Sequence, residues 1–139
     1  MVRAFWRFWQ LTLIVPALVV ATPTSAQTGS TTGQGGAHFL VYFDEFSAFL
    51  SDEAKTIIAD AAKRARAAGA RRIVVQARAS ATGKAETNKY LAQTRSSIVT
   101  DELEADGIAR TIIQQEPIGQ TGSNDPTVTE RRVDIVIEP

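Results

Sequence analysis

The chain has 139 residues, with 15 basic and 15 acidic side chains, one histidine and no cysteine. This length leaves room for one domain, and the composition is that of an ordinary globular protein. The lack of cysteine excludes disulfide bonds, thiolate metal ligands and a lipidated cysteine anchor.

The N-terminal segment has the proportions of a secretory signal. Two arginines lie within or ahead of an apolar stretch that runs to residue 21, and Thr24-Ser25-Ala26 supplies the small residues that a signal peptidase reads. We therefore expect a signal peptide over residues 1–26. The alternative is an uncleaved membrane anchor, but Arg7 and Pro16 interrupt the apolar segment, and a spanning helix needs about 20 apolar residues.

A flexible leader is expected after the signal, followed by one domain. Residues 27–37 contain no apolar side chain larger than alanine, so they cannot bury enough surface to become ordered. The domain is expected over residues 38–139. Cleavage would remove two basic residues and no acidic ones, leaving 13 basic against 15 acidic and a net charge of −2. A mildly acidic domain is a poor nucleic-acid binder.

The first half of the domain predicts a strand and a helix. Residues 39–43 are aromatic or branched and have strand length. Ser51 is placed to cap a helix, and Gly69 to end it in a left-handed conformation. The apolar stripe of this helix would be Ala54, Ile57, Ile58, Ala61, Ala65 and Ala68.

The second half predicts three strands, a helix and a loop. Strands are expected over 73–77, 111–116 and 131–137, a helix over 85–106, and a polar loop over 117–129. The order strand, helix, strand, helix, strand, strand predicts an α/β protein. Its form would be a two-layer α/β sandwich, with a mixed four-stranded sheet and both helices on one face.

Arg95 lies on the face of the second predicted helix that should be buried. Asn88, Leu91, Arg95 and Ile98 are spaced three, four and three residues apart, so they share that face. An arginine there either extends its head to water over the core or is held for an anion. In the second case, Arg95→Ala should remove binding and leave the fold largely intact.

The region around this helix follows a recognisable pattern. A glycine loop leads to an asparagine, a leucine, an arginine, a valine and a closing glycine, here Gly83, Asn88, Leu91, Arg95, Val99 and Gly107. Further matching segments are Val41-Tyr42-Phe43-Asp44, Leu50-Ser51 and Arg131-Arg132-Val133-Asp134-Ile135. In their order and spacing these segments resemble the OmpA-like family, the C-terminal peptidoglycan-associating domain of outer membrane protein A type.

The resemblance implies a ligand. The family domain grips the diaminopimelate side chain of uncrosslinked peptidoglycan stems, whose free end carries an ammonium and a carboxylate. An arginine takes the carboxylate, and the matching position here is Arg95, whose fork suits a planar anion. The ligand-binding residues implied in this chain are Arg95, Asn88, Ser80, Gly83, Leu91 and Arg131.

One position departs from the family pattern. The family holds the ammonium with an aspartate three residues before the loop glycine, where this chain has Ser80. A hydrogen bond to an ion is worth about 1.5–3 kcal/mol, against about 0.5–1.5 for a neutral one, so binding should weaken about tenfold or more. Glu86 could reach back to supply the missing charge, but a solvated role in the first helical turn is the simpler interpretation.

The arginine pair at the last predicted strand leaves an alternative open. Neighbouring residues of a strand point to opposite faces, so only one of Arg131 and Arg132 can line a pocket. The sequence does not say which.

No catalytic, cofactor or metal site is expected. The single histidine, His38, follows the leader and is a poor general base, and no phosphate loop precedes a helix. We expect a non-catalytic periplasmic protein of a Gram-negative bacterium, associated with the outer membrane or cell wall and binding peptidoglycan stem peptides weakly. The alternative is a degenerate OmpA-like scaffold for protein–protein interaction with envelope proteins. Membrane contact of the chain itself is expected only if the signal segment is uncleaved.

Overall fold

The computed structural model describes residues 36–80, 82–121 and 130–139. The predicted signal peptide, nearly all of the predicted leader and most of the predicted loop lie outside these residues. Within the described part, no helix is both long and apolar enough to span a membrane.

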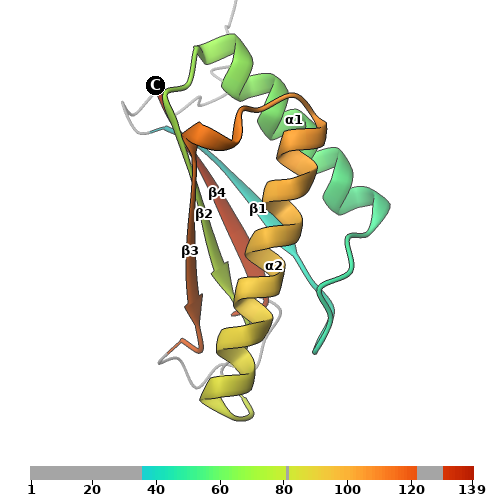
Figure 1. The fold of residues 1–139 in the computed structure, drawn as a ribbon. Helices are drawn as coiled ribbons and strands as arrows, with labels where there is room; N and C mark the ends of the chain where they lie inside the picture. The colour runs from blue at the N-terminus through green and yellow to red at the C-terminus, as the bar shows by residue number, and fades with distance from the viewer. Residues whose placement is uncertain (1–35, 81, 122–129) are drawn as a thin grey trace, which may run out of the picture. The chain divides into compact units, whose positions relative to one another are not determined.

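Two helices cover one face of a four-stranded sheet (Figure 1). The strand order is β1-β4-β2-β3, with β4 antiparallel to both of its neighbours and β2 parallel to β3. The predicted α/β sandwich with a mixed sheet is thus confirmed. The elements are β1 (Ala37–Tyr42), α1 (Asp52–Ala68), β2 (Arg72–Arg78), α2 (Ala85–Ala105), the 3-10 helix η1 (Arg110–Ile112), β3 (Ile113–Gly119) and β4 (Arg132–Glu138).

Helix α1 begins and ends where its sequence signals lie. The Ser51 side chain accepts a hydrogen bond from the Ala54 backbone N–H at 3.1 Å, which satisfies one of the free donors of the first turn. Gly69 ends the helix at φ 60°, a left-handed conformation that glycine adopts without steric cost. The helix buries Ala54, Ile58, Ala61, Ala62 and Ala65, whereas Ala68 of the predicted stripe is exposed.

The core lies between the helices and the sheet. Val133, Ile135 and Ile137 alternate along β4 and are at most 1% exposed, and Val41, Ile73 and Val75 pack beside them. Alternation places Asp134 and the other intervening residues on the opposite face of the sheet.

Polar side chains occupy much of the buried face of α2. Asn88, Arg95, Ser96 and Thr100 are all at most 1% exposed. Leu91 and Ile98, which the helical spacing places beside them, are only partly buried and pack against the core. Such a face needs internal hydrogen-bond partners, because an unpaired buried polar group is costly.

The third strand differs from its prediction at both ends. Residues 110–112 form a 3-10 turn, and β3 continues through Pro117 to Gly119, where a loop was expected. Proline is tolerated there because β3 is an edge strand, and an edge strand can hold a residue that donates no ladder hydrogen bond. The first strand also begins at Ala37, one residue inside the predicted leader.

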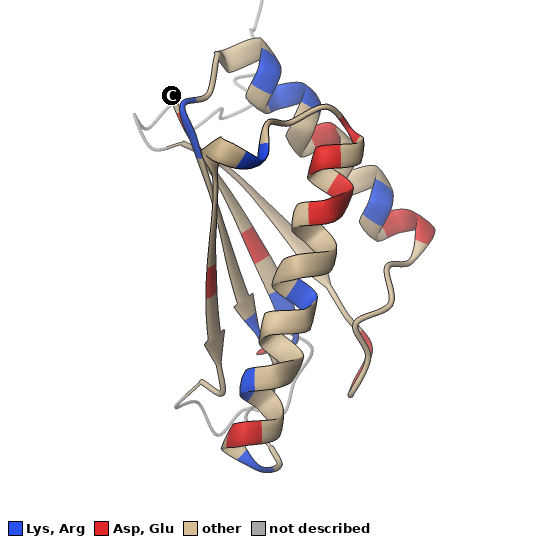
Figure 2. Ribbon diagram, viewed as in Figure 1, with Lys and Arg blue, Asp and Glu red and all other residues tan. Residues whose placement is uncertain are grey.

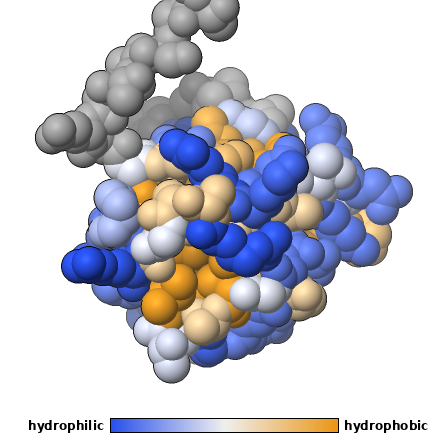
Figure 3. Space-filling model, turned by 90° about the horizontal axis from the view of Figure 1, so that it is seen from above, coloured by the Kyte–Doolittle hydropathy of each residue, from blue (hydrophilic) through white to orange (hydrophobic). Residues whose placement is uncertain are grey.

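An apolar patch lies at the end of the domain where α1 ends and where η1 leads into β3. Seen from this end, apolar residues gather between hydrophilic ones (Figure 3). A shallow hollow of about 140 Å³ there is lined by small and aliphatic residues, including Ala65, Ala70, Ile108 and Ile112. The predicted ligand residues lie at the other end of the sheet, where β1 and β2 finish and β4 begins.

Candidate functional site

Arg95 occupies the centre of the site and is fully buried. Its Nε donates to the Ser47 carbonyl at 2.8 Å, and its Nη2 donates to the Asp44 carbonyl at 2.9 Å. Its Nη1 donates to the carbonyls of Arg78 and Ala79, both at 3.0 Å. These bonds use four of the five N–H groups of a guanidinium. Arg95 therefore ties α2 to the ends of β1 and β2.

The guanidinium of Arg95 also lies over an aromatic ring and near a second cation. Its central carbon is 5.0 Å from the centroid of Phe43, a cation–π distance. Burial, together with a smaller contribution from repulsion by Arg131, lowers the pKa of Arg95 to about 10. The side chain remains charged at neutral pH. Neither of the two sequence interpretations foresaw this arrangement, because the head group neither reaches water nor faces an open pocket.

The segment that caps Arg95 contains a strained residue. Ser47 N donates to the Asp44 carbonyl at 3.2 Å, which closes a four-residue turn. Phe46, the third residue of that turn, has φ 53° and is the one non-glycine residue of the described chain with positive φ. Turns with positive φ at this position favour glycine or asparagine. The two carbonyls that Arg95 holds, on Asp44 and Ser47, flank Phe46 on both sides.

Asn88 organises the loop that carries Ser80. Its Nδ2 donates to the carbonyls of Ser80 at 3.3 Å and Thr82 at 2.8 Å. Ser80 is 5% exposed, and its Oγ accepts from the Thr82 backbone N–H and contacts the Thr82 hydroxyl at 3.0 Å. Gly83 adopts φ 93°, so a residue with a side chain would be strained there. The Ser80 hydroxyl is thus already hydrogen-bonded within its own loop.

The structure brings most of the predicted site residues together. Asn88 binds the Ser80 loop, Arg95 binds the carbonyl of Ala79 next to it, and Arg131 is close enough to Arg95 to affect its pKa. Leu91 is the exception, because it is a partly buried residue that packs on the core. Glu86 is exposed in the first turn of α2.

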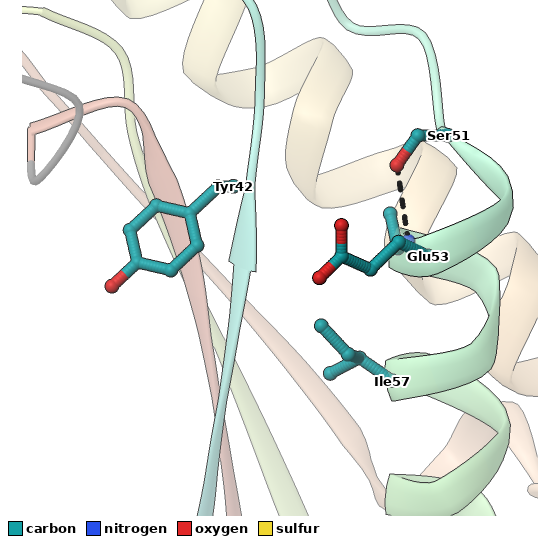
Figure 4. Close-up of a pocket in the computed structure, with 5 residues that line it drawn as sticks. Tyr42, Ser51, Glu53 and Ile57 are labelled. Carbon is teal, nitrogen blue, oxygen red and sulfur yellow. Dashed lines mark hydrogen bonds between the residues drawn. The ribbon is translucent and has the colours of Figure 1, made fainter.

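A hollow of about 250 Å³ opens beside Arg131, between the end of β1 and the start of α1. We call it the β1–α1 hollow. A smaller hollow of about 80 Å³ shares Tyr42, Ser51 and Glu53 with it; in the close-up of this smaller hollow, Glu53 and Ile57 project from α1 toward β1, and the Tyr42 ring lies on the other side of the strand (Figure 4). Arg131 Nε is buried and has no hydrogen-bond partner among the described residues. The β1–α1 hollow is lined by Tyr42, Phe43, Asp44, Phe49, Ser51, Glu53 and Arg131.

The second arginine of the pair has a different role. Arg132 lies on the face of the sheet opposite α1 and α2, where its Nε donates to the Asp134 carboxylate at 3.0 Å. Arg78 Nη1 binds the same carboxylate at 3.0 Å, and His38 Nε2 lies 3.3 Å from it. In Figure 2, basic segments of α2, β2 and β4 come together near these strand ends. Of the two arginines, Arg131 lines the hollow and Arg132 belongs to this Asp134 cluster.

Sequence reasoning missed Asp44, Ser47 and Glu53 as parts of this region. The first two act through backbone carbonyls, for which a sequence pattern carries no signal. Glu53 is an acidic residue in the first turn of α1, where the helix dipole alone accounts for it, so the sequence gives no sign of a ligand there.

Comparison with known proteins assigns the chain to a family. A model of the OmpA family matches residues 42–133, about two-thirds of the sequence. The chain belongs to the OmpA family, as the resemblance predicted. No curated protein matches the sequence.

Solved structures share the fold at low sequence identity. The peptidoglycan-associated lipoprotein from Burkholderia pseudomallei has a TM-score of 0.62 at 22% identity, covering 72% of this chain and 90% of that one. The OmpA-like domain of FopA1 from Francisella tularensis has a TM-score of 0.64 at 17% identity, covering 78% and 84%. The periplasmic domain of Helicobacter pylori MotB has a TM-score of 0.63 at 19% identity, covering 81% and 82%.

Proposed function

We propose that this protein is a non-catalytic cell-envelope protein that associates weakly with peptidoglycan through the carboxylate of a diaminopimelate stem peptide. Membership of the OmpA family and the fold shared with a peptidoglycan-associated lipoprotein support this function. The signal-like N-terminus supports export to the periplasm of a Gram-negative bacterium, at the outer membrane or cell wall.

The observation that carries the proposal is a pair of arginines without a carboxylate partner. Arg95 is fully buried and bonds only to backbone carbonyls, and Arg131 has an unpartnered Nε beside it. Neither forms an ion pair within the described part of the chain. Arg131 adjoins this buried Arg95 cation, and a carboxylate bound to Arg131 would offset their mutual repulsion, which adds to burial in lowering the pKa of Arg95. A stem-peptide carboxylate has the charge and planar shape for this site.

The variant Arg131→Ala tests whether the carboxylate of the stem peptide binds at this site. Arg131 is only partly buried and lines an open hollow, so Arg131→Ala should leave a folded protein. We expect this variant to lose most sedimentation with isolated sacculi, and free diaminopimelate to compete for the wild-type protein. Arg71→Ala is the matched control, because it removes the same charge at the opposite end of β2. Sedimentation unchanged in Arg131→Ala would reject the proposed site.

A second function is favoured by the way in which the site is closed. Four N–H groups of Arg95 are already bonded, and the Ser80 hydroxyl is bonded within its own loop. A domain that had kept the fold and lost the ligand would have these features, and it would act as a scaffold for envelope proteins. A scaffold would neither sediment with sacculi nor respond to free diaminopimelate.

A further inference from the structure

We infer that Glu53 is a ligand-binding residue that receives the ammonium of a zwitterionic ligand, taking over the role that Ser80 cannot fill. The inference rests on the proposed function, because it assigns Arg131 to the carboxylate of the same ligand. It places the ligand in the β1–α1 hollow, on the α1 side of Arg95, and not in the loop of Ser80.

The charges that line the hollow are the first step. Glu53 and Arg131 both line it, yet they form no ion pair with each other or with any other described residue. Glu53 comes from α1, and Arg131 lies directly before β4. Their charged side chains therefore border the hollow from two different elements. An amino-acid end that carries one ammonium and one carboxylate is complementary to this pair of charges.

The position of Glu53 is the second step. Glu53 lines both the β1–α1 hollow and the smaller hollow of Figure 4, where its carboxylate projects from α1 toward β1. Asp52, its neighbour in the same helical turn, does not line either hollow on this side of the domain. Both acids lie in the first turn, where the helix dipole favours negative charge, but of the two only Glu53 lines the hollow.

The alternative acceptors are less suited to the ammonium. Ser80 is 5% exposed, and its hydroxyl is bonded to Thr82. Asp44 also lines the hollow, but its backbone carbonyl holds Arg95 and closes the turn, so a change there would disturb the fold as well as the ligand.

The test compares two ligands with two variants. Titration calorimetry would use a synthetic stem peptide that ends in diaminopimelate, and the same peptide with the free amine of that residue acetylated. Glu53→Gln should weaken binding of the free-amine peptide about two- to fivefold, the range of a solvent-exposed ion pair. Binding of the acetylated peptide should not change, and Asp52→Asn should bind both peptides like the wild type.

The outcomes separate this inference from the proposed function. Loss of binding in Arg131→Ala together with unchanged binding in Glu53→Gln would overturn the role of Glu53 and leave the peptidoglycan function standing. Equal weakening for both peptides in Glu53→Gln would also overturn it, because the effect would then not involve the ammonium. No binding of either peptide by the wild-type protein would reject the proposed function itself.

Discussion

Two groups of arginines lie at the same end of the sheet, and only one of them has a carboxylate partner among the described residues. On the face opposite α1 and α2, Arg78 and Arg132 both bind the Asp134 carboxylate, which is 3% exposed. On the helix-covered face, Arg95 and Arg131 have no carboxylate partner within the described residues. The first group has a carboxylate partner within the protein, which is typical of a structural cluster. The second leaves positive charge for a partner from outside, and this difference distinguishes support of the fold from a candidate site.

The largest effect is expected from Arg95→Ala. The substitution removes four hydrogen bonds and leaves without a donor the carbonyls of two residues after β1 and two at the end of β2, each costing about 1–3 kcal/mol where it stays shielded from water. We expect a loss of about 4 kcal/mol or more in the free energy of unfolding, measured in urea. This replaces the expectation, drawn from the sequence, that the fold would be largely intact.

Arg95→Lys separates the contribution of the charge from that of the hydrogen-bonding geometry. A lysine keeps the charge, but its compact ammonium lacks the planar fork that reaches carbonyls of several segments at once. It should recover less than half of the lost stability. A lysine variant as stable as the wild type would show that charge, and not the bonding geometry, is what the core requires.

Asp134→Asn tests the arginine group that has a carboxylate partner, Arg78 and Arg132. The substitution leaves two arginines facing a neutral amide, but their side chains are about one-quarter exposed and can turn toward water. The cost should therefore lie below that of a fully buried ion pair, at about 2 kcal/mol. Thermal unfolding measures this loss, and sacculus sedimentation should remain at the wild-type level. Reduced sedimentation in a folded Asp134→Asn protein would contradict the separation of the two groups.

Ser80→Asp adds a carboxylate near Arg95 and Arg131, the arginine group that has no carboxylate partner among the described residues. The Ser80 site is nearly closed, and Glu53 is assigned to the ammonium, so the gain in stem-peptide affinity should be about 1 kcal/mol, or roughly fivefold. Calorimetry with the stem peptide measures it, and the gain should disappear when Arg131→Ala is added. If affinity falls in a folded protein, the new carboxylate neutralises the arginines itself and excludes the ligand.

The smallest effect is expected at the strained turn over Arg95. Phe46→Gly removes the cost of a bulky residue at positive φ, about 1–2 kcal/mol, but adds freedom to the unfolded chain that costs about 0.5–1 kcal/mol. The net change should be a gain of about 0.5 kcal/mol in thermal unfolding. Phe49→Gly is the control, since Phe49 is also exposed and has no positive φ, and it should only destabilise.

The sequence alone determined the class of fold, because the relevant signals are local. The spacing of Val133, Ile135 and Ile137 indicated a strand, and Ser51 and Gly69 marked the ends of a helix that the structure confirms. The order of these elements, with the family pattern, led to the α/β sandwich. The extension of β3 through Pro117 could not be predicted, since it depends on which strand lies at the edge of the sheet.

Only the tertiary structure decided what the site residues do. The spacing of α2 placed Arg95 on the buried face, but its partners are carbonyls of residues 16 to 51 positions away in the sequence. The choice between Arg131 and Arg132 depended on which face of the sheet each side chain reaches and on the Asp134 cluster. A sequence pattern reports side-chain types at fixed spacing, whereas backbone acceptors and unpaired charges appear only when distant segments meet.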